Sequence, residues 1–526
     1  MKLKLKIVTC ILIMLICTFT RCKRQLDLAP QGELTEATFY QTEANFDAAT
    51  ISAYVTLQTY YYDQFGSGWY QPILYPDDDV TVRSNESNQI EDFNWLPSNG
   101  SFQALWEASY KGVQRANVIL EQLPKAQHFS DEANKPRYEG EAKFMRAYFN
   151  FVLALHWGNP PVADTVISDI VSARLPNSQP GEIWDLIQSD LNFAKKALPA
   201  NWPASNTGRA TSGAASGLLG RVLLYRAQWE RKPEFYTAAD AEFSEIIAKG
   251  DYRLTDRYAD NFDLSTENNS ESLFEVQFAF GRNNNWNPSE NGGGTGTGRY
   301  IMWRVACESG ACADGANGDG YGYMHVVTPL QNEFERADPR RVSSVFLQGD
   351  PFPSANTPVF QGAWSVTGST PSKYIINDKS GSEIAGEPNM GTNNERVLRY
   401  ADILLMSAEC KILGPSPNLA AAAALINQVR RRADPGGSVL PDRSGTGTAT
   451  DLFRLLMHER RVELALEGHR YNDLVRWHRA GLINIKTDID FGRTPANNNW
   501  QEKNLLKPIP QRELDLNKNL AQTTGY

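Results

Sequence analysis

The segment ERRVELALEGHRYNDLVRW, from Glu459 to Trp477, holds four Glu or Asp residues, four Arg residues and one His in nineteen positions. Such a density of charge indicates either a catalytic centre or a joint between helices. On a helix, Glu459, Glu463 and Glu467 recur every four residues and form one acidic stripe beside an apolar face. Gly468 is expected to end this helix, and a second helix follows. No nucleophile or set of metal ligands accompanies the charges, so the segment predicts a joint in which Glu–Arg pairs fix how two helices meet.

Helical periodicity extends outward from this segment. Before it, RVLRYADILLMSAECKIL, NLAAAAALINQVRRRAD and ATDLFRLLMHERRVELALEG each predict a helix bounded by Pro or Gly. Earlier still, RYEGEAKFMRAYFNFVLALHWG spaces its apolar residues three and four apart and stops at Gly158. GEIWDLIQSDLNFAKKALP and TSGAASGLLGRVLLYRAQW predict two more helices, the second with Gly217 and Gly220, where a neighbouring helix can approach closely. Helical hairpins in series without a clean sequence repeat predict a mostly α, repeat-like fold.

The composition changes between about Asp251 and Asn394, where Gly, Asn, Pro and Ser dominate and aromatic residues lie between them. This composition predicts loops and turns. The short run SLFEVQFAF favours a strand. We therefore expect an export segment at 1–21, a helical region at 22–250, a loop-rich region at 251–394 and a second helical region at 395–526.

The first residues predict export. A cationic start with three Lys precedes Ile7–Thr20, an apolar run that is too short to span a bilayer and is typical of a signal peptide. Cys22 follows and favours lipoprotein processing, in which the thiol is acylated and the acyl chains anchor the protein in a membrane. Arg21 stands where a small residue is usual, and Cys17 is a competing position.

Charge and cysteine content narrow the class of protein. With 41% hydrophobic residues the chain can bury a core, and removal of residues 1–21 deletes four positive charges and shifts the net charge from −9 to −13. An acidic chain gives no electrostatic support for binding nucleic acid. Cys307 and Cys312 lie five apart in a loop, where an oxidising compartment permits a local disulfide; two free thiols are an equal alternative.

Motifs of known catalytic chemistry fail in detail. HERRV begins like a zinc-protease helix, but Val462 replaces the second His. The glycines at 292–298 do not fit GxGxxG, and no GxSxG occurs. The acids of YPDDDV, at 77–79, need a distant partner to form a glycosidase pair. DGANGDG departs from the EF-hand pattern, and an irregular calcium site at Asp314, Asn317 and Asp319 stays open. No catalytic residue, metal ligand set or cofactor is predicted.

Aromatic residues in the loops are the strongest indication of a ligand. Their ring faces stack on the apolar face of a sugar, and neighbouring Asn, Asp and Arg side chains bond its hydroxyls. The alternative for each ring is packing beneath its loop. The candidate ligand-binding residues are Trp69, Tyr70, Trp95, Trp286, Tyr300, Trp303, Tyr321, Tyr323 and Trp364.

Several long blocks together resemble the SusD/RagB family of outer-membrane nutrient-binding lipoproteins. In the C-terminal part they are VLRYADILLMSAEC, LINQVRRRA, ERRVELALEGHRYNDLVRW and KPIPQRELDLNKNLAQTTGY. Before them stand CKRQLDLAP, EAKFMRAYFNFVLALHWGNPPV and PLQNEFERADPRR. The resemblance covers essentially the whole chain after the export segment.

The resemblance implies a tetratricopeptide-like superhelix of helical hairpins with an irregular capping region that presents the ligand site. It also implies a non-enzymatic protein, lipid-anchored at the exterior of the outer membrane, that binds oligosaccharide and delivers it to a SusC-like TonB-dependent transporter. Some members bind peptides or other nutrients, so a peptide ligand stays an alternative, and a secreted glycosidase is a third. Lys23 and Arg24 depart from the acidic residues that often follow the acylated Cys in surface-exposed members.

Overall fold

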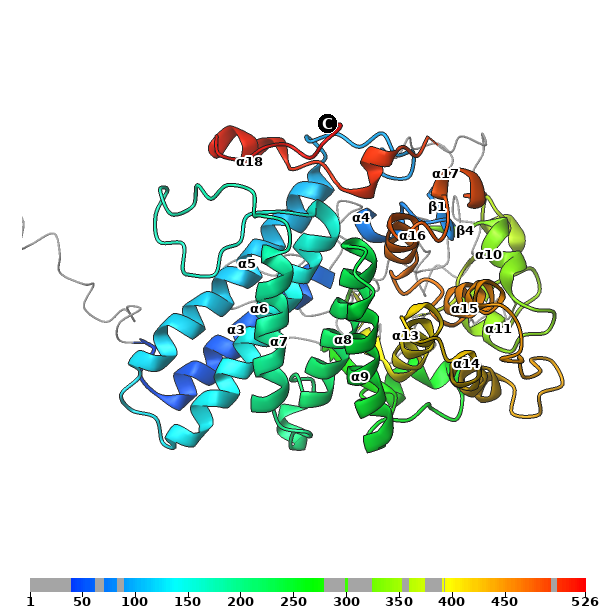
Figure 1. Cartoon of the computed structure of the whole chain (residues 1–526), viewed down its shortest axis with the longest axis horizontal. Coiled ribbons are helices and arrows are strands. Elements are labelled where there is room, and N and C mark those ends of the chain that lie inside the picture. Colours follow the sequence, from blue (N-terminus) through cyan, green and yellow to red (C-terminus); the bar gives the residue numbers. More distant parts are fainter. Residues whose placement is uncertain are drawn as a thin grey trace, which may run out of the picture.

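The computed structural model describes residues 39–61, 71–82, 89–278, 299–300, 324–351, 359–373, 390–391, 393–492 and 499–526. The described chain is mostly helical, as predicted, and its long helices lie side by side in a row across the molecule (Figure 1). They are α3 (Glu43–Tyr61), α5 (Gly100–Gln122), α6 (Lys135–Trp157), α7 (Glu182–Ala197), α8 (Ser212–Trp229), α9 (Glu234–Lys249), α13 (Tyr400–Leu413), α14 (Leu419–Ala433), α15 (Ala449–Glu463) and α16 (Arg470–Arg479).

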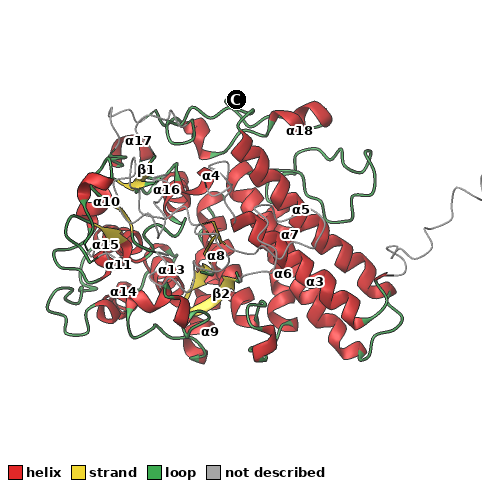
Figure 2. Cartoon of the chain, turned by 180° about the vertical axis from the view of Figure 1, so that it is seen from behind, coloured by secondary structure: helices red, strands yellow, loops and turns green. Residues whose placement is uncertain are grey.

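Helices that follow one another in sequence pack against one another. Helix α3 packs on α5, α5 on α6, α6 on α7, α7 on α8, α8 on α9 and α9 on α13. Helix α13 also packs on both α14 and α15. Seen from behind, α3, α5, α6 and α7 again gather on one side and α14 and α15 on the other (Figure 2). Among the described residues, five short α-helices complete the α-helical part: α4 (Gln71–Leu74), α10 (Thr328–Glu333), α11 (Arg340–Ser344), α17 (Ile485–Asp488) and α18 (Gln511–Leu516).

Several predicted helix ends are confirmed by their caps. Helix α6 ends at Trp157, and Gly158 follows with φ +74°, a conformation that favours glycine. Helix α8 begins after Thr211, whose hydroxyl accepts a hydrogen bond from the backbone N–H of Ala214. A Cβ on Gly220 would lie 2.4 Å from Phe243 of α9, so this glycine does permit the close approach of a helix that the sequence predicts. At Gly217 the close neighbour, at 2.6 Å from such a Cβ, is Leu398 in the strand Glu395–Arg399.

Strands are short within the described ranges and form only two-stranded antiparallel pairs (Figure 2). The longest pair joins β2 (Ser272–Val276) to β8 (Glu395–Arg399), which confirms the strand predicted in SLFEVQFAF. The other pairs are β1 (Val80–Thr81) with β4 (His325–Val326), β3 (Arg299–Tyr300) with β7 (Met390–Gly391), and β5 (Val345–Phe346) with β6 (Thr370–Pro371).

Two predicted helix boundaries are wrong. The start of RVLRYADILLMSAECKIL forms strand β8, because its backbone pairs with β2, and α13 begins only at Tyr400. Helix α15 ends at Glu463 rather than at Gly468. Leu466 and Gly468 have φ of +65° and +77°, outside the helical range, so Glu467 lies in a turn and not on the predicted acidic stripe.

The core is centred on α6, α8 and α13, whose side chains are almost all buried. Buried side chains on these helices include charged ones, among them Arg146, Arg221, Asp402 and Glu409. A buried charge is costly unless it is paired, so these residues require partners on neighbouring elements. No helix among the described residues is long and apolar enough to cross a membrane.

Candidate functional site

The segment Glu459–Trp477 lies inside a cluster of buried ion pairs, which we call the charged joint. Its central acid is Glu463, whose carboxylate lies 3.2 Å from Arg340 Nη1 and 3.2 Å from Arg399 Nη1 and also pairs with Arg432. Glu459 lies 3.0 Å from Arg430 and also pairs with Arg340. The Glu and Arg side chains around Glu463 are at most 3% exposed. The joint therefore ties α15 to α11, β8 and α14.

Further pairs extend the charged joint into the core helices. Arg460 lies 2.7 Å from Asp402 on α13 and 2.8 Å from Asp473 on α16. Arg476 donates a hydrogen bond of 2.8 Å to Glu409 on α13. Each buried charge identified on α13 thus has a partner from the segment, as a structural joint requires.

Two acids of the charged joint, Glu463 and Glu467, are held ionised. Burial acts to raise the pKa of Glu463, but Arg432, Arg399 and Arg340 outweigh it and hold the pKa well below its ordinary value. Burial also acts to raise the pKa of Glu467, but Arg399 and Lys373 outweigh it and lower the pKa. A general acid or base needs a pKa near the working pH. These carboxylates are suited to compensating charge and not to proton transfer.

The acids of YPDDDV belong to the same joint. Arg461 on α15 contacts Asp78 at 2.9 Å and Asp79 at 2.8 Å, and Arg470 contacts Asp78 at 2.7 Å. Burial opposes the effect of these cations, yet Arg461 and Arg470 lower the pKa of Asp78 to about 2. The glycosidase alternative needs an acid that can be protonated at working pH. Asp78 is committed instead to holding the α4–β1 segment against α15 and α16.

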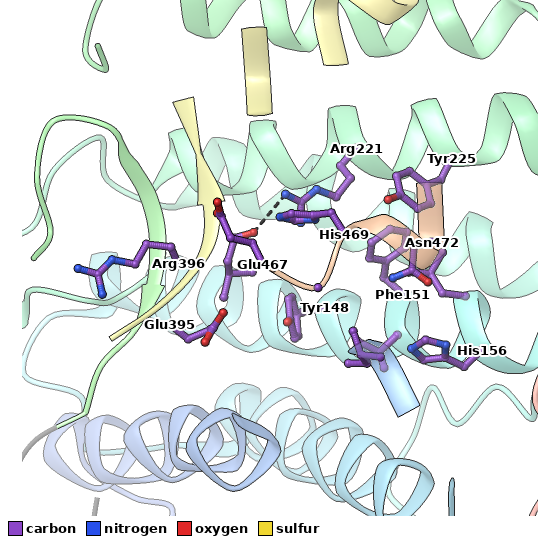
Figure 3. Close-up of a pocket in the computed structure, with 15 residues that line it drawn as sticks. Tyr148, Phe151, His156, Arg221, Tyr225, Glu395, Arg396, Glu467, His469 and Asn472 are labelled. Atoms are coloured by element: carbon purple, nitrogen blue, oxygen red, sulfur yellow. Dashed lines mark hydrogen bonds between the residues drawn. The ribbon is translucent and has the colours of Figure 1, made fainter. Parts of the chain in front are cut away.

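A cavity of about 80 Å³ lies beside the charged joint, between α6, α8, β8 and the turn before α16 (Figure 3). Tyr148 and Phe151 of α6 form an aromatic wall, and Glu395, Glu467 and His469 stand among its polar side chains. Burial lowers the pKa of His469 to about 4 against the attraction of Asp402, so the ring is neutral near pH 7. Sites for organic ligands measure about 300–1,000 Å³, so this cavity suits a few waters and excludes an oligosaccharide.

A buried lysine borders the same region. Lys507 Nζ lies 2.9 Å from His156 Nδ1, and no acid of the described chain forms an ion pair with it. Burial lowers the pKa of the Lys507 ammonium to about 7. Because the folded protein disfavours this proton, Lys507 lowers stability below about pH 7, and the penalty disappears as the pH rises to about 10.5.

Lys507→Met is therefore expected to raise the free energy of unfolding near neutral pH by about 2 kcal/mol, after allowance for the lost contact with His156. The gain should shrink toward pH 10, because the unfolded wild-type chain then also loses this proton and folding no longer has to remove it. Urea unfolding of both proteins across this range measures the difference. Lys518→Met, at an exposed lysine, is the control and should show no such trend. A gain from Lys507→Met that does not change with pH would contradict the assignment.

Two of the predicted ligand-binding rings are buried, which corrects the prediction for them. Trp95 is 2% exposed, donates its indole N–H to Ile90 O at 2.9 Å and packs on Tyr471. Trp364 is 5% exposed and packs edge-on against Phe360. Both rings pack beneath their loops and do not offer a face to a ligand.

Of the remaining candidate rings, Tyr300 lies in the described strand β3, whose backbone pairs with β7. The following candidates lie outside the described residues: Trp69, Tyr70, Trp286, Trp303, Tyr321, Tyr323, Cys22, Cys307, Cys312, Asp314, Asn317 and Asp319. Among the described residues, no group of three His, Cys, Asp or Glu side chains is arranged to hold a metal ion.

The described residues that flank two of the predicted ligand-binding segments lie next to one another. Gln58, near the end of α3, donates its amide to Gln277 O at 2.8 Å, and Phe278 N donates to Asn394 Oδ1 at 2.9 Å. The end of α3, the end of β2 and the start of β8 are thus neighbours. The chain enters segments 62–70 and 279–298 from adjacent positions.

Two family models match the chain. The model of the SusD family matches residues 261–526, and one described as "Starch-binding associating with outer membrane" matches residues 26–224. SusD-like protein P25 of Formosa agariphila is 25% identical over an alignment of 552 positions that covers 96% of both chains.

Solved structures share the fold over nearly the whole chain. A laminarin-binding SusD-like protein matches with a TM-score of 0.73 and 26% identity, covering 93% of this chain and 100% of the other. A SusD homologue from Bacteroides thetaiotaomicron matches with a TM-score of 0.78 and 23% identity, covering 94% and 99%. The latter likeness shows the fold alone.

Proposed function

This chain belongs to the SusD family, and on that premise we propose that it binds an oligosaccharide nutrient at the cell surface without cleaving it. The observation that carries the proposal is the likeness to a laminarin-binding SusD-like protein over 93% of the chain. The charged joint supports the non-catalytic part, because its acids are engaged with buried Arg side chains, which lower the pKa values of Asp78 and Glu463. Burial raises the pKa of Asp79, but Asp78 and Asp79 are both buried and both pair with Arg461, so they do not flank a cleft. A glycosidase would need two acids with contrasting pKa values across a cleft.

We place the ligand on the segment 62–70 and on the loop-rich region 251–394. Trp69, Tyr70, Trp286, Trp303, Tyr321 and Tyr323 are the proposed stacking residues. The meeting of α3, β2 and β8 supports this location, because it brings the entry points of two of these segments together. We also propose that the chain is divided into a helical region at 22–250, a loop-rich region at 251–394 and a second helical region at 395–526.

We further propose that Cys22 carries a lipid anchor in the outer membrane and that the protein delivers its ligand to a SusC-like TonB-dependent transporter. The family description of outer-membrane association over residues 26–224 supports the location. Cys22→Ser is expected to release the protein from the membrane fraction or to block maturation. Unchanged processing and membrane attachment of the variant would contradict the anchor.

A soluble protein that starts after Cys22 tests the binding proposal. Calorimetric titration with laminarihexaose and with maltohexaose is expected to show saturable binding of at least one of them, and chromatography of the mixture is expected to show no shorter product. A peptide library titrated in parallel separates the alternative ligand class. Binding of peptides with no response to either glycan would favour that alternative, and glycan hydrolysis by the pure protein would overturn the proposal.

A further inference from the structure

A larger cavity, of about 260 Å³, lies apart from the charged joint and shares no lining residue with the cavity of Figure 3. Four described parts of the fold line it: the connection from α7 to α8, the N-cap residue of α8, the chain after α9, and strand β2 with the residues before it. Its walls consist of Asn201, Trp202, Thr207–Arg209, Thr211, Asp251, Tyr252, Asn268–Ser270 and Ser272–Glu275.

The walls of this cavity are held in place by the protein itself. Trp202 donates its indole N–H to Ala210 O at 2.8 Å. Tyr252 and Thr211 share a hydrogen bond of 3.0 Å between their hydroxyls. The side-chain amides of Asn268 and Gln277 exchange two hydrogen bonds of 2.9 Å. A site with fixed walls loses little conformational entropy when a ligand binds.

The electrostatics of the cavity disfavour an anionic ligand and are compatible with a neutral one. Arg209 is its cation, and that guanidinium is already engaged by Asp47 and by Glu141 at 3.3 Å. Asp251 and Glu275 add negative charge to the walls. An anionic ligand would therefore meet two carboxylates and no unpaired cation among the lining residues.

Polar groups remain available for such a ligand. The side chains of Asn201, Asp251, Ser270 and Ser272 form no hydrogen bond within the described part of the chain. A ligand rich in hydroxyl groups would satisfy these donors and acceptors.

We propose that this cavity is a second carbohydrate-binding site, which takes one or two neutral sugar units. Amide and hydroxyl side chains around two aromatic rings, Trp202 and Tyr252, match the alternating polar edges and apolar faces of a sugar. The volume of about 260 Å³ is near the lower end of the range for ligand sites, about 300–1,000 Å³, and excludes a long chain. The proposal goes beyond the loop site and does not depend on it.

Saturation-transfer NMR of the mature chain with laminaribiose, maltose and cellobiose as probes tests the second site. At least one probe is expected to bind. Ser270→Trp fills the cavity and is expected to weaken that binding by about tenfold or more. Ser205→Trp, at an exposed position in the short 3-10 helix Ala204–Asn206, which is not among the described lining residues, is the matched control and should bind as the wild type does.

A second variant distinguishes loss of the binding site from loss of the fold. Asn201→Ala combined with Asp251→Ala removes two exposed side chains from the rim and is expected to weaken the same binding with unchanged thermal unfolding. The Trp286→Ala, Trp303→Ala protein should retain it, because the proposed second site is independent of the loop site. Absence of binding by all probes, or equal binding by Ser270→Trp and the wild type, would overturn the second site. Either result leaves the loop site to be judged by its own titration.

Discussion

Glu463→Gln is expected to lower the free energy of unfolding by about 3–5 kcal/mol, because it leaves buried cations without compensation. The Glu463 carboxylate pairs with Arg340, Arg399 and Arg432, and all four side chains are at most 3% exposed. A neutral amide is nearly isosteric with the carboxylate, so packing is preserved and the change isolates the charge. Urea unfolding followed by circular dichroism measures the loss.

The matched control is Glu121→Gln. Glu121 pairs with Lys125 at 2.8 Å on the surface of the fold, where the two side chains are 45% and 56% exposed. Solvent screens such a pair, so its removal is expected to cost less than about 1 kcal/mol. Equal losses in the two variants would show that burial does not strengthen the charged joint and would contradict its structural role.

Trp286→Ala combined with Trp303→Ala is expected to weaken oligosaccharide binding by about tenfold or more, because two stacking faces are lost. Thermal unfolding should stay close to that of the wild type. Calorimetric titration with the glycan that the wild type binds measures the change.

Trp95→Ala is the matched control for the tryptophan pair. Trp95 packs against Phe102 and Tyr471 in the core, so its removal should cost about 3–5 kcal/mol of stability and leave the affinity of the folded protein unchanged. Full affinity in the Trp286 and Trp303 double variant would place the glycan elsewhere.

The charged joint could be predicted from the sequence, but its partners could not. Periodicity shows which side chains share a helix face and not what that face meets. Arg340, Arg399 and Arg432 reach Glu463 from α11, β8 and α14. Each of the three lies inside a block that carries the family resemblance. The blocks are PLQNEFERADPRR, VLRYADILLMSAEC and LINQVRRRA. These blocks meet in space at one cluster of ion pairs.

The turn after α15 shows a local limit of sequence reasoning. Gly468 is a plausible end for a helix, but the chain leaves the helix five residues earlier and places Leu466 at φ +65°. Tertiary contacts decide this, because the turn lets Glu467 reach Arg399 and Lys373, each at 2.8 Å. Such a gain overrides the local preference of Leu.

The aromatic prediction failed at Trp95 and Trp364 for a different reason. Composition marks a segment as a loop but does not distinguish a ring beneath the loop from one above it. For Trp95 a signal was present, because Ile90 and Phe93 stand within five residues and are also buried. A local apolar group of this kind indicates a small core under the loop.

The most direct test of the proposed division between charged joint and loops is the oligosaccharide affinity of Glu463→Gln. The measurement is a calorimetric titration at low temperature, where circular dichroism confirms that the variant is folded. An affinity equal to that of the wild type is predicted, because the charged joint stabilises the scaffold and does not touch the ligand. Loss of affinity in the folded variant would place the charged joint in the binding site and contradict the account.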